Sequence, residues 1–72
     1  MKFVPGELVR VTSAPRRLFA EGMRGMSGSA VVCTVSDSDL LVVLSYDAWG
    51  QVMALTPQGQ TGWISDCWLT WL

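Results

Sequence analysis

With 72 residues, this chain has room for a single domain, which we expect to span residues 1–72. Half of its residues are hydrophobic and 15% are charged, a composition that is typical of a folded chain and excludes a disordered one. Its longest apolar run, Leu40–Leu44, is far shorter than the roughly 20 residues that cross a bilayer, and Pro5 and Gly6 interrupt the place of a signal peptide's apolar segment, so we expect a cytoplasmic protein.

The first element in chain order is a strand over residues 7–13. In "ELVRVT", Val9 and Val11 share one face while Arg10 and Thr12 take the other, which is the period-two pattern of a half-buried strand. The following segment, "SAPRRLFAEGMRGMSG", contains Pro15 and several glycines that break regular structure. We expect it to be a long basic surface loop, with a short helical turn around residues 17–21.

Two further alternating segments follow this loop. "SAVVCTVS" places Val31, Cys33 and Val35 on one face, and "SDSD" supplies turn residues before "LLVVLSY". These two segments predict a β-hairpin. "DAWG" then predicts a turn, "QVMALT" a strand, "PQGQ" a turn, "TGWIS" a short strand and "LTWL" a terminal one. Short strands at regular spacing, without an amphipathic helix, predict an all-β sandwich or barrel.

Three segments resemble SH3-like small β-barrels of the bacterial SH3 or KOW type. "PGELVRV" resembles their "GD-x-V-x-V" first strand, with Glu7 in place of Asp, and "GMRGMSGSAVV" resembles the start of their second strand, through Gly25 and Gly28. "GWISDCWLTWL" resembles the end of an SH3 domain. The resemblance implies a five-stranded SH3-like barrel with a long loop between strands 1 and 2. Such barrels are common among uncharacterised bacterial and phage proteins.

The resemblance also implies positions for the tryptophans. If Ile64 and Leu69 take the family's buried aliphatic positions, alternation turns Trp63 outward and Trp71 inward. Trp68 then replaces the groove tyrosine of the family, and Ser65 replaces the groove proline. The "ALYDY" segment and the acidic loop of eukaryotic SH3 domains are absent, so we do not expect recognition of proline-rich peptides.

From this alignment we expect a non-catalytic interaction module or small accessory subunit that contacts another protein through aromatic side chains. The expected binding residues are Tyr46, Trp49, Trp63, Ser65 and Trp68. The alternative for the tryptophans is that all four belong to the core or its rim.

A second alternative is a KOW-like nucleic-acid-binding protein. Arg16, Arg17 and Arg24 fall in one expected loop, where guanidinium groups can bind phosphates. The residues before position 27 carry a net charge of +3 and those after it carry −4, although only five basic residues are present in all. A dedicated nucleic-acid binder usually has a strongly basic face.

Catalytic and metal-binding patterns are missing from the sequence. It contains no histidine, no phosphate-binding glycine motif and no CxxC pair, so we expect no enzyme, cofactor or metal site. An enzymatic alternative is a barrel like the plasmid-encoded dihydrofolate reductase, to which the resemblance is one of barrel type only. We interpret Cys33 and Cys67 as two small buried hydrophobic residues, with a disulfide between them as the alternative.

The apolar excess predicts self-association. "LLVVL" is apolar on both faces of a strand, and a single barrel covers only one face. We therefore expect a homo-oligomer, most simply a symmetric dimer, with Leu41, Val43 and a terminal tryptophan at or near the interface.

Overall fold

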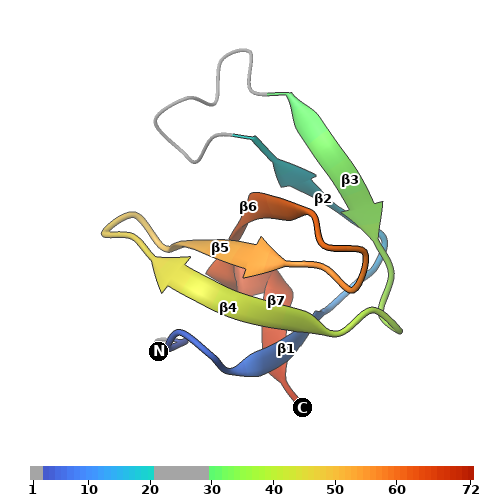
Figure 1. Cartoon of the computed structure of the whole chain (residues 1–72). Helices are drawn as coiled ribbons and strands as arrows, with labels where there is room; N and C mark the ends of the chain where they lie inside the picture. The colour runs from blue at the N-terminus through green and yellow to red at the C-terminus, as the bar shows by residue number, and fades with distance from the viewer. Residues whose placement is uncertain (1–2, 21–29) are drawn as a thin grey trace.

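A computed structural model describes residues 3–20 and 30–72. Within these ranges the chain forms seven strands and one three-residue 3-10 helix (Figure 1). In chain order these are β1 (Leu8–Val11), β2 (Arg16–Phe19), β3 (Val31–Val35), β4 (Leu41–Tyr46), β5 (Gln51–Leu55), β6 (Thr61–Ser65), η2 (Asp66–Trp68) and β7 (Leu69–Trp71). The prediction of an all-β chain is confirmed.

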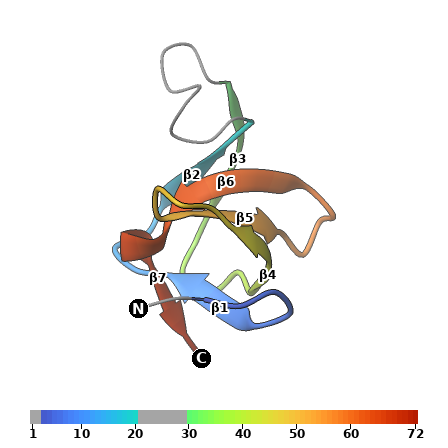
Figure 2. The same cartoon turned by 90° about the vertical axis from the view of Figure 1, so that its left-hand side faces the viewer.

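All seven strands belong to one antiparallel sheet, in the order β3-β2-β6-β5-β4-β1-β7. The sheet bends round, so that β1 lies below β5 and β6 in both views (Figures 1 and 2). This curvature encloses one face of the sheet and leaves the other face outside. We call these the inner and outer faces.

The inner face carries the hydrophobic core. Val9 and Val11 are buried while Leu8 and Arg10 are exposed, which confirms the period-two prediction for β1. Strands β5 and β6 alternate in the same way. The buried hydrophobic residues are Phe3, Val9, Val11, Leu18, Val35, Leu41, Val43, Val52, Ala54, Ile64 and Leu69.

The region after β1 differs from the prediction. Residues 16–19 form strand β2, where a surface loop and a helical turn were expected, and only four residues separate β1 from β2. The long connection therefore lies between β2 and β3. Because Leu18 is fully buried and pairs opposite Cys33, β2 becomes the strand that joins β3 to the rest of the sheet.

The predicted hairpin of residues 29–36 with residues 40–46 is wrong. The turn between them forms, with the Asp39 carboxylate accepting the Ser36 amide at 2.9 Å, but β3 pairs with β2 while β4 pairs with β1 and β5. The turn thus links two strands that do not pair. The prediction of five strands also differs from the seven that the described residues form.

The later predictions hold. "DAWG" and "PQGQ" connect β4 to β5 and β5 to β6 as antiparallel neighbours, and the terminal "LTWL" supplies β7. No helix in the described ranges has the length and apolar character to span a membrane.

Candidate functional site

A row of hydrophobic side chains crosses the outer face of the sheet. Four strands place their residues directly opposite one another: Met53 of β5 faces Trp63 of β6, Trp63 faces Phe19 of β2, and Phe19 faces Val31 of β3. Directly opposite residues of antiparallel strands share a face, with Cβ atoms about 4.5–5.5 Å apart. We call Met53, Trp63, Phe19 and Val31 the outer row.

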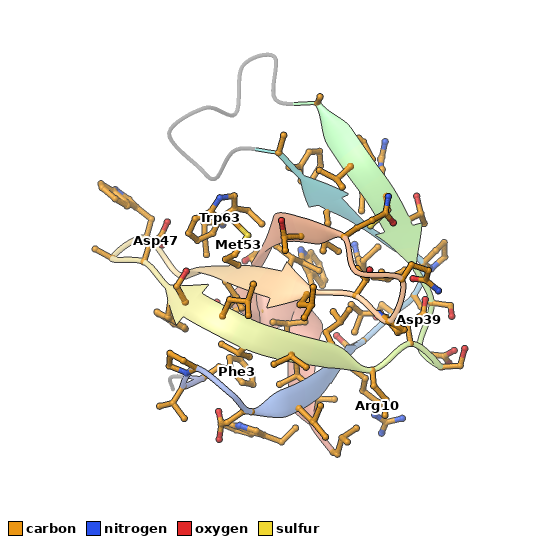
Figure 3. All side chains as sticks on the ribbon, viewed as in Figure 1. Phe3, Arg10, Asp39, Asp47, Met53 and Trp63 are labelled. Atoms are coloured by element: carbon orange, nitrogen blue, oxygen red, sulfur yellow. The ribbon has the colours of Figure 1, made fainter. Side chains whose placement is uncertain are left out.

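Alternation fixes the direction of the outer row. Three of its members lie next to residues whose side chains fill the core: Leu18 precedes Phe19, Ala54 follows Met53, and Ile64 follows Trp63. Val31 joins the row because a shift in register between Leu18 and Phe19 brings it opposite Phe19, so it does not share a face with Cys33 and Val35 as the alternation predicts. Phe19, Met53 and Trp63 are half-buried by their neighbours, while Val31 at the edge is 46% exposed. Figure 3 shows Met53 and Trp63 beside each other on this side of the sheet. The result is a continuous apolar strip on the outside of the fold.

Trp63 thus points outward, as the alternation predicts. Sequence reasoning missed its two partners, Phe19 and Met53. Phe19 was missed because β2 was interpreted as a loop. The signal for Met53 was present in "QVMALT", where Met53 alternates with the buried Val52 and Ala54.

Tyr46 contacts the first residue of η2, which directly follows Ser65. The Tyr46 hydroxyl donates a hydrogen bond to Oδ2 of Asp66, the residue after Ser65. This hydrogen bond, followed by desolvation and by the charges of Asp66 and Asp47, raises the pKa of Tyr46 above its usual range. The phenol therefore stays protonated and holds the end of β4 against η2.

Trp49 belongs to the turn between β4 and β5. The Asp47 carboxylate accepts the amides of Trp49 at 2.8 Å and Gln51 at 2.9 Å, and Gly50 takes a positive φ of 78°. The Gly50 carbonyl in turn accepts the amide of Asp66 at 2.8 Å. The Trp49 side chain is exposed at this corner, which also holds Tyr46 and Ser65.

Trp68 is the last residue of η2, and the side chain of Arg16 from β2 lies over its ring. The guanidinium of Arg16 lies 3.5 Å from the centroid of the Trp68 ring, and Arg16 Nε donates to the Thr12 carbonyl at 3.3 Å. Such a cation–π contact is worth about 0.5–1 kcal/mol where the pair is exposed. Trp68 keeps 38% of its surface, so it lies at the rim of the fold in contact with β2.

Trp71 shares the inner face with Leu69 and Val9, as the alternation predicts, but it is not enclosed. Its ring packs on Phe3 with centroids 4.6 Å apart and remains 36% exposed, because β7 ends at the margin of the sheet. Trp71 Nε1 donates to Oε1 of Glu7 at 3.0 Å, and the Val4 amide donates to the same oxygen at 2.8 Å. These two hydrogen bonds lower the pKa of Glu7.

The arginines expected in one loop do not form a cluster within the described residues. Arg16 and Arg17 are consecutive in β2, so their side chains point to opposite faces of the sheet. Arg16 contacts Trp68, whereas Arg17 is exposed on the outer face opposite Thr34. Arg24, together with Gly25 and Gly28, lies outside the described residues.

The interpretation of the cysteines is correct only in part. Both thiols are free, so the alternative disulfide is not formed. Cys33 is half-buried, and desolvation, followed by the charge of Asp39, raises its pKa. Cys67 is exposed on η2, where its Sγ lies 3.1 Å from Ser65 Oγ, so it is not a buried hydrophobic residue.

Leu41 and Val43 do not lie at a surface. Both are fully buried within a single chain, because β4 turns them to the inner face between β1 and β5. The exposed residues of the same apolar run are Leu40 and Leu44, which are 44% and 40% exposed. The prediction that Leu41 and Val43 lie at an interface is therefore wrong, because the exposed positions of this run lie one residue away from them.

The expected binding residues thus separate into three places: Trp63 in the outer row, Trp68 beside β2, and Tyr46, Trp49 and Ser65 around the turn that contacts η2. Comparison of the chain with known proteins adds no name to these sites: no protein-family model, curated protein or solved structure matches it.

Proposed function

We propose that this chain is a non-catalytic protein-interaction module whose partner binds the outer row. The observation that carries the proposal is the register that aligns Met53, Trp63 and Phe19 on the outside of three neighbouring strands. Aromatic side chains and methionine are enriched at protein interfaces, where they bury a large area. A rigid sheet that presents such side chains needs little ordering when a partner binds.

The remaining aromatic residues fit this proposal less well. The Trp68 ring is already occupied on one side by Arg16, and the Trp71 ring by Phe3. The Tyr46 hydroxyl is engaged by Asp66. These contacts tie strands together within the chain, so we assign to these three residues a role at the rim of the core and to Trp63 the principal contact with the partner.

The SH3-like resemblance is part of the proposal. The order of a strand, a short 3-10 helix and a final strand at residues 61–71 supports it, because the segment "GWISDCWLTWL" resembles the end of an SH3 domain. The cytoplasmic location is supported by the two free thiols, which are usual in a reducing compartment. Nucleic-acid binding stays the alternative prediction, and in the described part of the chain the arginines form no cluster that favours it.

A capture experiment with charge variants tests the proposal. Met53→Lys places an ammonium group in the middle of the outer row, where a long side chain reaches solvent without entering the core. Gln58→Lys adds the same charge at an exposed turn residue between β5 and β6. We expect tagged wild-type and Gln58→Lys chains to retain the same protein from a lysate of the native host and Met53→Lys to lose it.

Two further arms make the experiment decisive. Thermal unfolding of each variant shows that the fold is kept, and Trp68→Ala tests the rim directly. A partner that Met53→Lys still binds and Trp68→Ala loses contradicts the assignment to the outer row. If the wild-type chain retains no protein from the lysate but binds single-stranded RNA or duplex DNA at low salt, the result favours nucleic-acid binding.

A further inference from the structure

Strand β3 is an edge of the sheet. It pairs with β2 alone and stands first in the strand order, and Figure 1 shows it at the outside of the molecule. One side of its backbone therefore has no neighbour in the sheet. The shift in register with β2 lies next to Val31, which leaves Cys33, Thr34 and Val35 regularly paired.

Within the residues that the structure describes, this edge has few of the features that usually prevent strand addition. Natural edge strands are protected by lysine, proline, inward-pointing charge, a β-bulge or a covering segment, and of these the described residues show only the shift in register next to Val31. β3 reads "VVCTV": it contains no charge and no proline, and three of its five residues are valine. Val31 and Thr34 are exposed, and Val32 and Cys33 are half-exposed.

The same features allow β3 to pair with β3 of a second copy of the chain. When a strand pairs with its own copy around a two-fold axis, any charge near the axis faces a like charge, and β3 has none. Among the residues that the structure describes, the nearest cation on the outer face is Arg17 of β2. The two copies of β2 would lie three strand spacings apart, about 14 Å, which exceeds the Debye length of about 8 Å at physiological ionic strength. The chain's net charge of −1 adds little repulsion between copies.

We propose that β3 pairs antiparallel with β3 of a second copy of this chain, around a two-fold axis at Cys33, so that the two sheets become one. A five-residue strand overlaps itself fully only when its middle residue lies on the axis. Val32 then lies opposite Thr34 of the second copy. The contact uses the backbone edge of β3, so it does not depend on what binds the outer row.

This register places the two Cys33 residues opposite each other, so a disulfide between them reports the pairing. Directly opposite residues in an antiparallel pair have Cα atoms about 4.5–5.5 Å apart, which falls within the range of about 4.4–6.8 Å that a disulfide spans. The pairing of one strand buries less surface than a standard interface of about 800 Å² per partner, so the dimer is weak and is best examined at about 0.5 mM protein.

The test combines sedimentation equilibrium with thiol oxidation. At this concentration the wild-type mass rises from 7.9 kDa toward twice that value. Thr34→Lys places like charges on two residues that lie diagonally across the axis, with Cα atoms about 7–8 Å apart, and returns the mass to that of one chain. The matched control, Thr61→Lys, changes an exposed threonine on β6, which has neighbours on both sides, and keeps the dimer. Thermal unfolding confirms that both variants are folded.

Oxidation by diamide, which accepts the two electrons and two protons that a pair of thiols loses, tests the register without any change at Thr34. Cys67→Ser, which keeps only Cys33, forms a covalent dimer faster than Cys33→Ser, although Cys67 is the more exposed thiol. A single-chain mass for the wild type, a dimer that Thr34→Lys leaves intact, or faster cross-linking through Cys67 each overturns the proposal.

Discussion

Replacing Gly62 tests how closely β2 and β6 approach. A Cβ atom at position 62 would lie 2.7 Å from Cβ of Leu18 and 3.2 Å from the carbonyl oxygen of Phe19. Ordinary contact begins at 3.4 Å, so Gly62→Ala requires the two strands to separate by about 0.7 Å. Neither neighbour is the flexible end of a side chain, and the strain must therefore be taken up by the backbone.

The expected loss of stability follows from two opposed terms. Overpacking of this kind costs about 1–3 kcal/mol, and replacing glycine by alanine within a strand returns about 0.5–1 kcal/mol of backbone entropy. The middle of each range gives a net loss of about 1.3 kcal/mol, a large share of the roughly 3–5 kcal/mol available to a domain of this size. With a urea m-value of about 1 kcal/mol/M, the unfolding midpoint falls by about 1.3 M. The fluorescence of the neighbouring Trp63 reports the transition.

Gly59 provides the control, because a Cβ there meets no atom within 4 Å while its φ of +86° penalises every L-residue. We expect Gly59→Ala and Gly59→Gln to cost similar amounts, whereas at position 62 glutamine costs more than alanine. If Gly62→Ala stays within about 0.5 kcal/mol of the wild type, the close approach of β2 and β6 is refuted.

Three further predictions concern titratable groups. The carboxyl of Glu7 has a pKa below its unfolded value of about 4.5. Its contribution to stability is therefore present above pH 4.5 and is lost as the pH falls through the folded pKa. In this acidic range the melting temperature of Glu7→Gln should depend less on pH than that of the wild type. Cys67 should react with a maleimide faster than Cys33 at neutral pH, because burial and Asp39 raise the pKa of Cys33. Mass spectrometry of Cys33→Ser and Cys67→Ser measures the two labelling rates, and faster labelling of Cys33 contradicts the prediction. Tyr46 is the only tyrosine, so its ultraviolet titration reads one group: its pKa should exceed the usual value of about 10 and move back toward it in Asp66→Asn, and equal values in the two proteins exclude the hydrogen bond.

The sequence by itself determined the parts of this fold that depend on local signals. Alternation around Val9 and Val11 predicts β1, and the turns "DAWG" and "PQGQ" predict that β4, β5 and β6 follow one another as antiparallel neighbours. Turn residues act over a few positions, where Asp47 fixes the chain through its own nearby amides. The outward direction of Trp63 was implied by the resemblance of its segment to the end of an SH3 domain, and Ile64 next to it is buried as that resemblance implies.

Tertiary structure decided the remainder. β2 is only four residues long and follows Pro15, so its local sequence favours a loop, and it becomes a strand because Leu18 enters the core and its backbone pairs with β3 and β6. The inward face of "LLVVL" cannot be chosen from the run itself, where both faces are apolar; pairing with β1 and β5 turns Leu41 inward. The outer row depends on the same long-range register, because Phe19 and Met53 become neighbours of Trp63 only when strands distant in the sequence are aligned.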